Sequence, residues 1–265
     1  MKNLLCRLDP KSLELVRSIG LLAQTQGVEA YLVGGPVRDL MLGVANTDLD
    51  ITVEAPYKPS ADKGPHAGHS QEPGTGKIGN AMRLADRFAA GHRGAAVTRY
   101  PAFKTATVRL ADGTLVDFAT ARSETYVRGG AFPAVQPSSI KDDLFRRDFT
   151  INAMAIAINP KTGGKVIDPF KGTADLKSKR IRILHEKSFL DDPTRILRAA
   201  RFKARLGFKI EAKTLKLLKS AIKIKVLETI KPQRYLKDFN KVLKEPKSGE
   251  AIKSLKSWNA YKQGA

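Results

Sequence analysis

Residues 31–53 read YLVGGPVRDLMLGVANTDLDITV, and the predicted fold depends on this stretch. A short apolar run ends at Gly34 and Gly35, and the apolar residues that follow recur at helical spacing. A second strand-like segment then carries Asp48 and Asp50. The stretch therefore predicts a strand, a glycine turn, a helix and a second strand.

Asp48 and Asp50 are two residues apart, so on a strand their carboxylates point to one face. Leu49 and Ile51 then point to the other face, into the core. Two like charges held side by side repel each other, and a divalent cation is the usual compensation. Hard oxygen ligands in small number, with room left for water and phosphate, favour Mg²⁺. Two solvated aspartates on an ordinary strand are the alternative.

The glycine turn predicts an anion site. Gly34 and Gly35 have no Cβ to block a ligand, and the positive end of the following helix favours negative charge. A triphosphate fits there, with Arg38 one turn into the helix. A tight turn without a ligand is the alternative, and it is less probable because the turn and the two aspartates occur together in one strand-helix-strand unit.

GGPVRDLMLG followed by DLD resembles the first motif of class II tRNA nucleotidyltransferases and bacterial poly(A) polymerases, members of the DNA polymerase beta nucleotidyltransferase superfamily. Pro36 departs from this motif, which usually has a small residue there, and it removes one N–H from the turn. The resemblance implies an α+β fold, in which a head with a small mixed β-sheet precedes an all-helical neck and a truncated body. The domains expected are the head at 1–150 with a flexible insertion at 54–77, the neck at 151–210 with a nucleotide-selecting helix, and the lysine-rich, RNA-binding body at 211–265.

Charge is the strongest property of the whole composition. The 265 residues carry 47 Lys and Arg against 26 Asp and Glu, a net charge of +21, and the sequence pI is about 10.1. Residues 201–265 contain 18 basic and 5 acidic side chains. This charge favours a nucleic-acid partner, and a solvated lysine-rich surface is the alternative. With no membrane-length apolar run, no secretory signal and Cys6 as the one cysteine, a cytoplasmic protein is expected.

The segments before residue 122 supply scaffold and a candidate third acid. Helical spacing predicts helices at 9–26 and 78–92, and a hairpin turning at 111–113 follows. Its second strand carries Asp117, which the superfamily pattern makes a third acid beside Asp48 and Asp50, although an outward-facing strand aspartate is the alternative. The insertion contains His66 and His69, for which a surface loop is favoured over a metal pair.

Residues 122–137 have turn chemistry and no periodicity, which predicts a loop. In the resembled family a flexible loop here helps the site change from accepting C to accepting A, and a plain connector is the alternative. A helix is expected from Ser138, through SSIKDDLFRRDFTINAMAIAI, with acids in its first turn. It must end or bend for the following charged side chains to share one site. These are Arg146, Arg147 and Asp148, and with Asn152 they resemble the family's second motif, RRDxTxNAM, which contacts the triphosphate and the ribose.

Two further motifs follow along the chain. Asp168, Gly172 and Asp175 resemble the third motif, DxxxGxxDL, whose role in the family is largely structural. SFLDDPTRILRAARFKARL, residues 188–206, resembles the fourth, EDxxRxxR, which selects the incoming nucleotide without a template. Pro193 is expected in the first turn of that helix, after a cap at Asp191 or Asp192. The nucleotide-binding residues expected there are Asp192, Arg195, Arg198 and Arg201, with the Asp192 and Arg195 pair at the Watson–Crick edge of the base.

Lysine-rich helices are predicted at 211–225, 232–245 and 247–258. They resemble the family's neck and the start of its body. Most relatives continue into a tail that grips the elbow of tRNA, so contacts limited to the acceptor and T stems are expected. For the fourth motif at residues 188–206, an amphipathic basic helix is the alternative.

The sequence therefore predicts a template-independent tRNA nucleotidyltransferase that adds CMP, AMP or both to the 3′ end by two-metal transfer. CTP and ATP are the expected substrates, and no protein or membrane partner is inferred. Asp48 and Asp50 are expected to hold Mg²⁺, while Gly35, Arg38 and Arg147 hold the triphosphate. A poly(A) polymerase and a non-catalytic RNA-binding protein on the same head are the alternatives.

Overall fold

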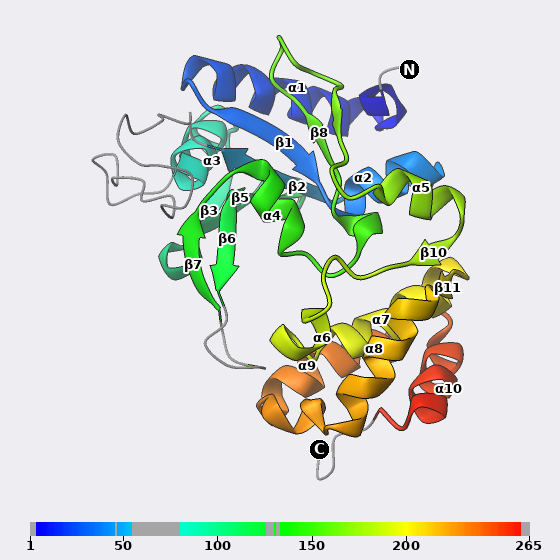
Figure 1. Ribbon diagram of the computed structural model, residues 1–265. Helices are drawn as coiled ribbons and strands as arrows, with labels where there is room; N and C mark the ends of the chain where they lie inside the picture. The colour runs from blue at the N-terminus through cyan, green and yellow to red at the C-terminus, as the bar shows by residue number, and fades with distance from the viewer. Residues whose placement is uncertain (1–3, 46, 55–79, 126–129, 131–132, 261–265) are drawn as a thin grey trace, which may run out of the picture. The chain divides into compact units, whose positions relative to one another are not determined.

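A computed structural model describes residues 4–45, 47–54, 80–125, 130 and 133–260, and Figure 1 shows their helices and strands. The chain forms two compact units, each assembled from separate stretches of sequence. Unit 1 comprises residues 1–123, 135–144 and 154–169, and unit 2 comprises residues 124–134, 145–153 and 170–265.

These units interleave along the sequence, whereas the domain boundaries predicted at residues 150 and 210 divide it in order. The boundaries at residues 150 and 210 therefore stay a prediction of which part of the chain carries out transfer, nucleotide selection and RNA binding. Apart from Glu54, the predicted insertion at 54–77 lies outside the described residues, as do His66 and His69.

Within the described residues, unit 1 is built on a seven-stranded sheet with the order β3-β4-β5-β2-β1-β8-β9. Its strands are β1 (Glu29–Val33), β2 (Leu49–Glu54), β3 (Ala96–Tyr100), β4 (Thr105–Arg109), β5 (Leu115–Thr120), β8 (Ala155–Ala157) and β9 (Val166–Ile167). β2 and β5 run parallel, and the other neighbouring strands run antiparallel. The mixed sheet confirms the predicted fold class and puts the strand that carries Asp50 at its centre.

Helices cover this sheet and hold its strands in place. Unit 1 contains η1 (Leu4–Arg7), α1 (Pro10–Thr25), α2 (Gly35–Leu42), α3 (Asn80–Ala90) and η2 (Pro101–Phe103). α1 packs against β1 and α3, and α3 packs against β4 and β5. Asp9 caps α1 by accepting the N–H of Ser12 at 3.0 Å, as its position before Pro10 favours. Both helices predicted in this part of the chain are confirmed.

Unit 2 consists of short helices and one small sheet. Its elements are η3 (Thr150–Asn152), α5 (Gly172–Lys177), β10 (Arg180–Ile181), α6 (Ser188–Asp191), α7 (Arg195–Leu206), β11 (Lys209–Ile210), α8 (Ala212–Lys223), η4 (Val226–Thr229), α9 (Pro232–Leu243) and α10 (Ser248–Trp258). α7 packs against α9 and α10 and buries Ile196, Leu197 and Phe202. The parallel pair of β10 and β11 is an addition to the all-helical neck that was expected.

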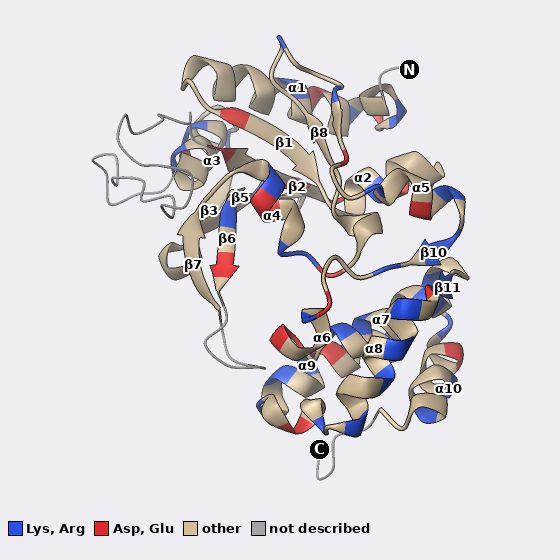
Figure 2. Ribbon diagram, viewed as in Figure 1, with Lys and Arg blue, Asp and Glu red and all other residues tan. Residues whose placement is uncertain are grey.

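The three lysine-rich helices are confirmed as α8, α9 and α10, and Pro232 stands in the first turn of α9. In Figure 2 the Lys and Arg positions, in blue, are distributed along the ribbons of these helices and of α7. Among the described helices, none has the length and apolar character needed to cross a membrane.

Two sequence predictions after residue 121 were wrong. The predicted loop at 122–137 contains β6 (Arg122–Thr125) and β7 (Ala134–Pro137), which pair in a two-stranded sheet. Each strand has four residues, too few for alternation to be recognised. The helix predicted from Ser138 is only α4 (Ile140–Phe145), and Ala155–Ala157 in its apolar end forms β8. All three residues of β8 are buried, so this run has no periodicity that separates strand from helix.

Candidate functional site

The glycine turn joins β1 to α2 in unit 1, as predicted. Gly34 has a φ of 74° and a ψ of −127°, a conformation that favours glycine. Its N–H donates to the carbonyl of Met154 at 3.1 Å, and its carbonyl accepts the N–H of Arg38 at 3.1 Å. Pro36 has no N–H. The N–H of Gly34, predicted to bind the triphosphate, is therefore already used, which leaves the N–H groups of Gly35 and Val37 as the candidate anion donors of the turn.

Arg38 lies beside this turn but is already engaged. Its side chain is buried, and its Nε and Nη2 donate to the two carboxylate oxygens of Asp39 at 2.8 and 3.0 Å. A Cβ added at Gly35 would lie 3.7 Å from Arg38 Nη2, so the guanidinium adjoins the turn. A bidentate pair fixes the plane of the guanidinium, and Asp39 therefore orients the cation that the sequence predicted at the triphosphate.

The acidic residues are placed by the strand register of unit 1. Asp48 immediately precedes β2, Asp50 lies within β2, and Asp117 lies in β5. Asp50 and Asp117 are direct partners in the parallel pairing of β2 with β5, so their side chains share one face of the sheet. Leu49 and Ile51, at 2% and 1% exposure, are buried toward the other face, as predicted.

Asp50 is also level with the glycine turn. In the antiparallel pairing of β1 with β2, Leu32 is opposite Ile51. The next positions along this register are Val33 and Asp50, which brings Asp50 to the end of β1 where Gly34 follows. The Oγ1 of Thr107 donates to Asp117 Oδ1 from the other side. The strand register therefore brings Asp50 and Asp117 side by side at the end of β1 where the glycine turn follows.

This donor set fits a hydrated divalent cation. Among the described residues, no group of three or more His, Cys, Asp or Glu side chains forms a complete metal site. Mg²⁺ is usually held by one or two carboxylates together with waters and substrate phosphates. Asp50 and Asp117 lie side by side, half-buried and exposed respectively, with Asp48 exposed just before them. The carboxylates therefore suit Mg²⁺ if the nucleotide completes its coordination.

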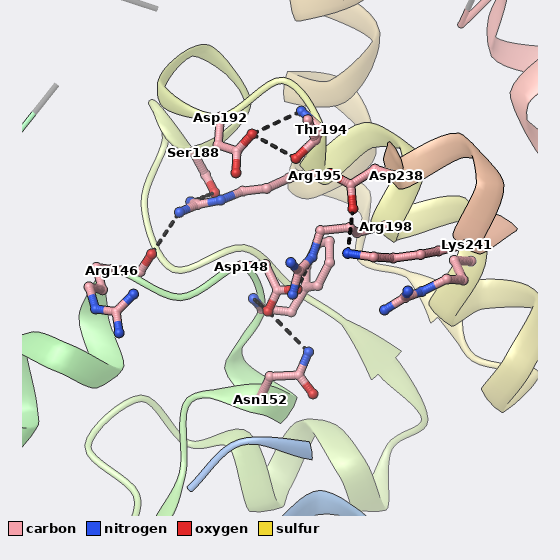
Figure 3. Close-up of polar contacts among 12 residues, drawn as sticks. Arg146, Asp148, Asn152, Ser188, Asp192, Thr194, Arg195, Arg198, Asp238 and Lys241 are labelled. Atoms are coloured by element: carbon pink, nitrogen blue, oxygen red, sulfur yellow. Dashed lines mark hydrogen bonds and ion pairs between the residues drawn. The ribbon is translucent and has the colours of Figure 1, made fainter. Parts of the chain in front are cut away.

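Unit 2 contains the other predicted site residues, and several form a buried network that Figure 3 shows. α4 ends at Phe145, so the turn that follows separates Arg146, Arg147 and Asp148, as predicted. Asp148 is 4% exposed. Its Oδ1 accepts the Nδ2 of Asn152 at 3.0 Å, and its Oδ2 accepts Nε of Arg198 at 2.8 Å and Nη2 at 2.6 Å.

The charges of this network stabilise one another. Burial by itself raises the pKa of Asp148, but the positive charge of Arg198 and the hydrogen bond from Asn152 outweigh it, so the net pKa is lowered. The negative charge of Asp148 in turn raises the pKa of Arg198. Asp148 and Arg198 therefore join the second and fourth motifs as a fixed ion pair.

The fourth motif begins differently from the prediction. α6 ends at Asp191 and α7 begins at Arg195, so Pro193 lies in the turn between them rather than in a first helical turn. Asp192 still acts as a local cap, because its Oδ1 accepts the N–H of Thr194 at 3.1 Å and the Oγ1 of Thr194 at 2.7 Å. The cap and proline therefore form a separate turn that sets the position of Asp192 (Figure 3).

Arg195 and Arg201 are less accessible than the sequence predicted. Arg195 is 4% exposed, and its guanidinium donates to Ser188 Oγ at 2.5 Å and to the carbonyl of Arg146 at 2.6 Å. Arg201 Nε lies 3.6 Å from Glu245 Oε1, and its guanidinium carbon lies 5.0 Å from the ring of Phe202. Burial, with the nearby charges of Arg198 and Arg205, lowers the pKa of Arg201. Arg201 is therefore part of the packing between α7 and the end of α9.

Asp175 of the third motif makes contacts within unit 2. Asp175 in α5 is buried and accepts Thr150 Oγ1 at 2.7 Å and Arg182 Nε at 3.0 Å. It therefore ties the turn of the second motif to β10.

Sequence reasoning missed the residues that hold these groups in place, namely Asp39, Ser188, Thr194, Arg234 and Glu245. Arg234 contacts Asp192 with 2.9 Å between Nη2 and Oδ1. Its place after Pro232 in a helical segment was the one available signal, and nothing in the lysine-rich pattern separates it from neighbouring cations.

Comparison with known proteins matches this chain to a poly A polymerase head domain and to tRNA nucleotidyltransferases. Residues 30–182 match the family model for the poly A polymerase head domain. An A-adding tRNA nucleotidyltransferase of Aquifex aeolicus is 41% identical over 236 residues, covering 89% of this chain and 26% of that relative. A CCA-adding enzyme in its apo form II has a TM-score of 0.83 and 40% identity, covering 97% of this chain and 55% of the other. A Thermotoga maritima CCA-adding enzyme complexed with tRNA has a TM-score of 0.77 and 39% identity, covering 97% and 53%. The chain thus spans about a quarter of the first and about half of the other two.

Proposed function

Because the chain belongs to the family of the poly A polymerase head domain, we propose that it is a template-independent tRNA nucleotidyltransferase. It transfers AMP, CMP or both from ATP and CTP to the 3′ end of tRNA. The observation that carries the proposal is the register that sets Asp50 beside Asp117 and level with the Gly34 turn. An anion site next to paired carboxylates is the arrangement that binding of a metal-bound triphosphate requires.

The reaction joins the 3′ oxygen of the RNA to the α-phosphorus of the nucleotide and releases pyrophosphate. Asp48 and Asp50 would hold Mg²⁺, with Asp117 beside Asp50 as a supporting acid, and the bound ion would lower the pKa of the ribose hydroxyl and stabilise charge on the phosphates. The N–H groups of Gly35 and Val37 bind triphosphate oxygens. Arg38, oriented by Asp39, adds a positive charge there.

The unit 2 residues select and position the nucleotide. Asp192 accepts a hydrogen bond from the exocyclic amino group of cytosine or adenine, and Arg195 donates to the neighbouring acceptor of the base. Arg147 contributes to triphosphate binding, and the Asp148, Asn152 and Arg198 network holds the ribose end of the site. Arg201 supports the same helix from its buried side.

The division of labour follows the predicted domains. Residues 1–150 carry transfer together with the nucleotide contacts of Arg147 and Asp148, residues 151–210 carry nucleotide selection, and residues 211–265 bind RNA through their lysines. The partner is tRNA, bound through its acceptor and T stems, and the proposed compartment is the cytoplasm.

A primer-extension experiment tests the proposal. The chain is incubated with tRNA ending before CCA, after C and after CC, with each nucleotide offered separately together with Mg²⁺. We expect AMP addition to tRNA ending in CC first, since a relative of 41% identity is A-adding, and CMP addition to the shorter tRNAs if the chain adds all three.

Two controls make the result specific. Asp50→Asn removes a metal ligand and should remove the activity, whereas Asp86→Asn alters an ion pair with Arg99 on the surface of unit 1 and should not. Incorporation of AMP into any RNA 3′ end without preference for tRNA would favour a poly(A) polymerase. Tight tRNA binding without incorporation of any nucleotide would favour the non-catalytic alternative.

A further inference from the structure

Arg234 links Asp192 to a second segment of unit 2. Arg234 lies in the first turn of α9, and its side chain is 20% exposed. Its Nη2 is 2.9 Å from Asp192 Oδ1, and its Nη1 donates to the carbonyl of Gly130 at 3.1 Å. One guanidinium therefore joins the turn before α7 to the segment between β6 and β7.

Among the described residues, the hydrogen bonds and the ion pair of Asp192 use the same carboxylate oxygen. Oδ1 accepts the N–H and the Oγ1 of Thr194 at 3.1 and 2.7 Å and faces Arg234 Nη2 at 2.9 Å. None of the contacts described for this carboxylate uses Oδ2, which projects away from Thr194 in Figure 3. Because three donors fix Oδ1, the direction of Oδ2 is fixed as well, and Oδ2 remains able to accept one hydrogen bond.

The backbone of Gly130, whose carbonyl accepts from Arg234, is fixed by its own contacts. Its N–H donates to the carbonyl of Asp191 at 3.3 Å, and its φ is 73°, in the left-handed region. A Cβ added there would lie 2.5 Å from Thr229 Oγ1 and 3.0 Å from the Thr229 carbonyl. Only glycine can occupy this position without displacing Thr229 or its own backbone. The position of the Gly130 carbonyl, which accepts from Arg234, therefore depends on the absence of a side chain.

We propose that Arg234 is a positioning residue for nucleotide choice, which it exerts by holding Asp192 with Oδ2 directed at the incoming base. This inference rests on the proposed function. A carboxylate is only an acceptor, so a fixed Oδ2 favours cytosine and adenine, which offer an amino donor on the base edge, over uracil, which offers a carbonyl. Without Arg234 only the two donors of Thr194 hold Oδ1, so the carboxylate is less restrained about its χ angles and the penalty against uracil falls.

The test compares kcat/KM for CTP, ATP and UTP in the full chain and four variants. Arg234→Met removes the contacts to Asp192 and to the Gly130 carbonyl, Gly130→Ala displaces that carbonyl, and a double variant combines the two changes. Arg205→Met is the matched control, because Arg205 pairs with buried Glu245 in the same unit with Nη2 2.7 Å from Oε1 and does not contact Asp192. Thermal unfolding is followed for all four.

We expect each single variant to lose about tenfold of the preference for CTP or ATP over UTP, the size of one base-edge contact. The double variant should lose no more than the worse single variant, because both changes break one chain of contacts. Arg205→Met should keep the wild-type preference at a similar loss of stability. Unchanged preference in Arg234→Met, multiplying effects in the double variant, or an equal shift in Arg205→Met would each overturn the proposal.

If Arg234→Met does not fold, Arg234→Lys and Gly130→Ala decide the matter. Lysine keeps the charge and loses the two-pronged geometry, so a partial loss of preference is expected and full wild-type preference would count against the proposal. If the wild-type chain transfers no nucleotide, the proposed function fails by itself. Equilibrium binding of CTP against UTP by wild type and Arg234→Met then tests the positioning role separately.

Discussion

Asp50 and Asp117 place two carboxylates at one position of a parallel strand pair. Asp50→Asn keeps the shape of the side chain and removes the negative charge, so the fold should be retained while metal binding is lost. Loss of a residue that only supports a metal ligand costs up to about a hundredfold in activity. Asp50 is proposed as a direct ligand, so we expect the rate of nucleotide addition to fall by more than about a hundredfold. The rate is measured at saturating Mg²⁺ and nucleotide.

Because Asp117 is the strand partner of Asp50, Asp117→Asn should also reduce the rate of nucleotide addition. The loss should be smaller than for Asp50→Asn if Asp117 contacts one of two metal ions. Thr107→Val is the control, since it removes the hydroxyl donor to Asp117 and keeps the carboxylate. A variant of Asp50 that retains more than a few per cent of the wild-type rate would contradict the assignment.

Asp148 gives a pH-dependent prediction. Its pKa in the folded chain lies below the ordinary value of 3.8, so folding favours the ionised form. Its contribution to the free energy of unfolding is therefore complete above about pH 4 and is lost as the pH falls through the lowered pKa. Asp148→Asn should be less stable than wild type at pH 7, and the difference should shrink below about pH 4.

Urea unfolding of both proteins between pH 7 and pH 3 measures this difference. A gap that stays constant over the whole range would show that packing, and not ionisation, accounts for the effect of Asp148.

At the scale of helices, Glu245 holds α7 to the end of α9. Its side chain is 3% exposed and lies 3.6 Å from Arg201 Nε and 2.7 Å from Arg205 Nη2. Glu245→Ala leaves two arginines without their buried acceptor, and breaking a buried pair in this way costs about 3–5 kcal/mol. Because Arg205 is 46% exposed and solvent screens its share, we expect the lower end of that range.

Chemical denaturation measures the loss, and the choice among nucleotides should not change in the variant that remains folded. Glu250→Ala, in the first turn of α10, is the control for removing a glutamate from the same region. A cost below about 1 kcal/mol for Glu245→Ala would mean that its arginines are stabilised by solvent.

The same helices show how far sequence reasoning reached. The helices α1, α3, α8, α9 and α10 were predicted correctly, because each has apolar residues at helical spacing over several turns. β6, β7 and β8 were missed because strands of three or four residues carry no period. The start of α7 was misplaced because Asp192 caps a turn that contains Pro193 before the helix begins.

The part of the candidate site that the sequence predicted consists of acidic residues that alternate with apolar residues on a strand. Strand alternation predicted that Asp48 and Asp50 share a face, and the family resemblance added Asp117, which the strand register pairs with Asp50. Their role in metal binding stays a prediction. The engaged states of Arg38, Arg195 and Arg201 were not predicted, because a charged residue in a motif carries no sign of the partner that the tertiary fold brings to it. Arg234 was missed for the same reason.

For the whole molecule, the excess of positive charge predicts how RNA binding responds to salt. Residues 201–265 carry 18 basic and 5 acidic side chains, and lysines neutralise phosphates without reading sequence. If about five phosphates are contacted, the logarithm of the binding constant should fall with the logarithm of salt with a slope of about −4.5.

Replacing exposed Lys216 or Lys219 on α8 with Gln should reduce that slope by about one unit. Lys161→Gln, an exposed lysine of unit 1, is the matched control and should leave it unchanged. Binding is measured with tRNA and with a minihelix of acceptor and T stems at several salt concentrations. Salt-independent binding would show that contacts other than phosphate neutralisation dominate.

The position of β8 in the sheet affects the chain while it is being made. β1 is complete at residue 33, but β8, its neighbour on one side, begins at residue 155. At about 5–20 residues per second, a ribosome takes roughly 6 to 25 seconds to cover that interval. Throughout it, one edge of β1 has no strand to pair with, and an open edge is a template for other chains. We therefore expect slower translation between these two strands to increase the aggregated share of the nascent protein.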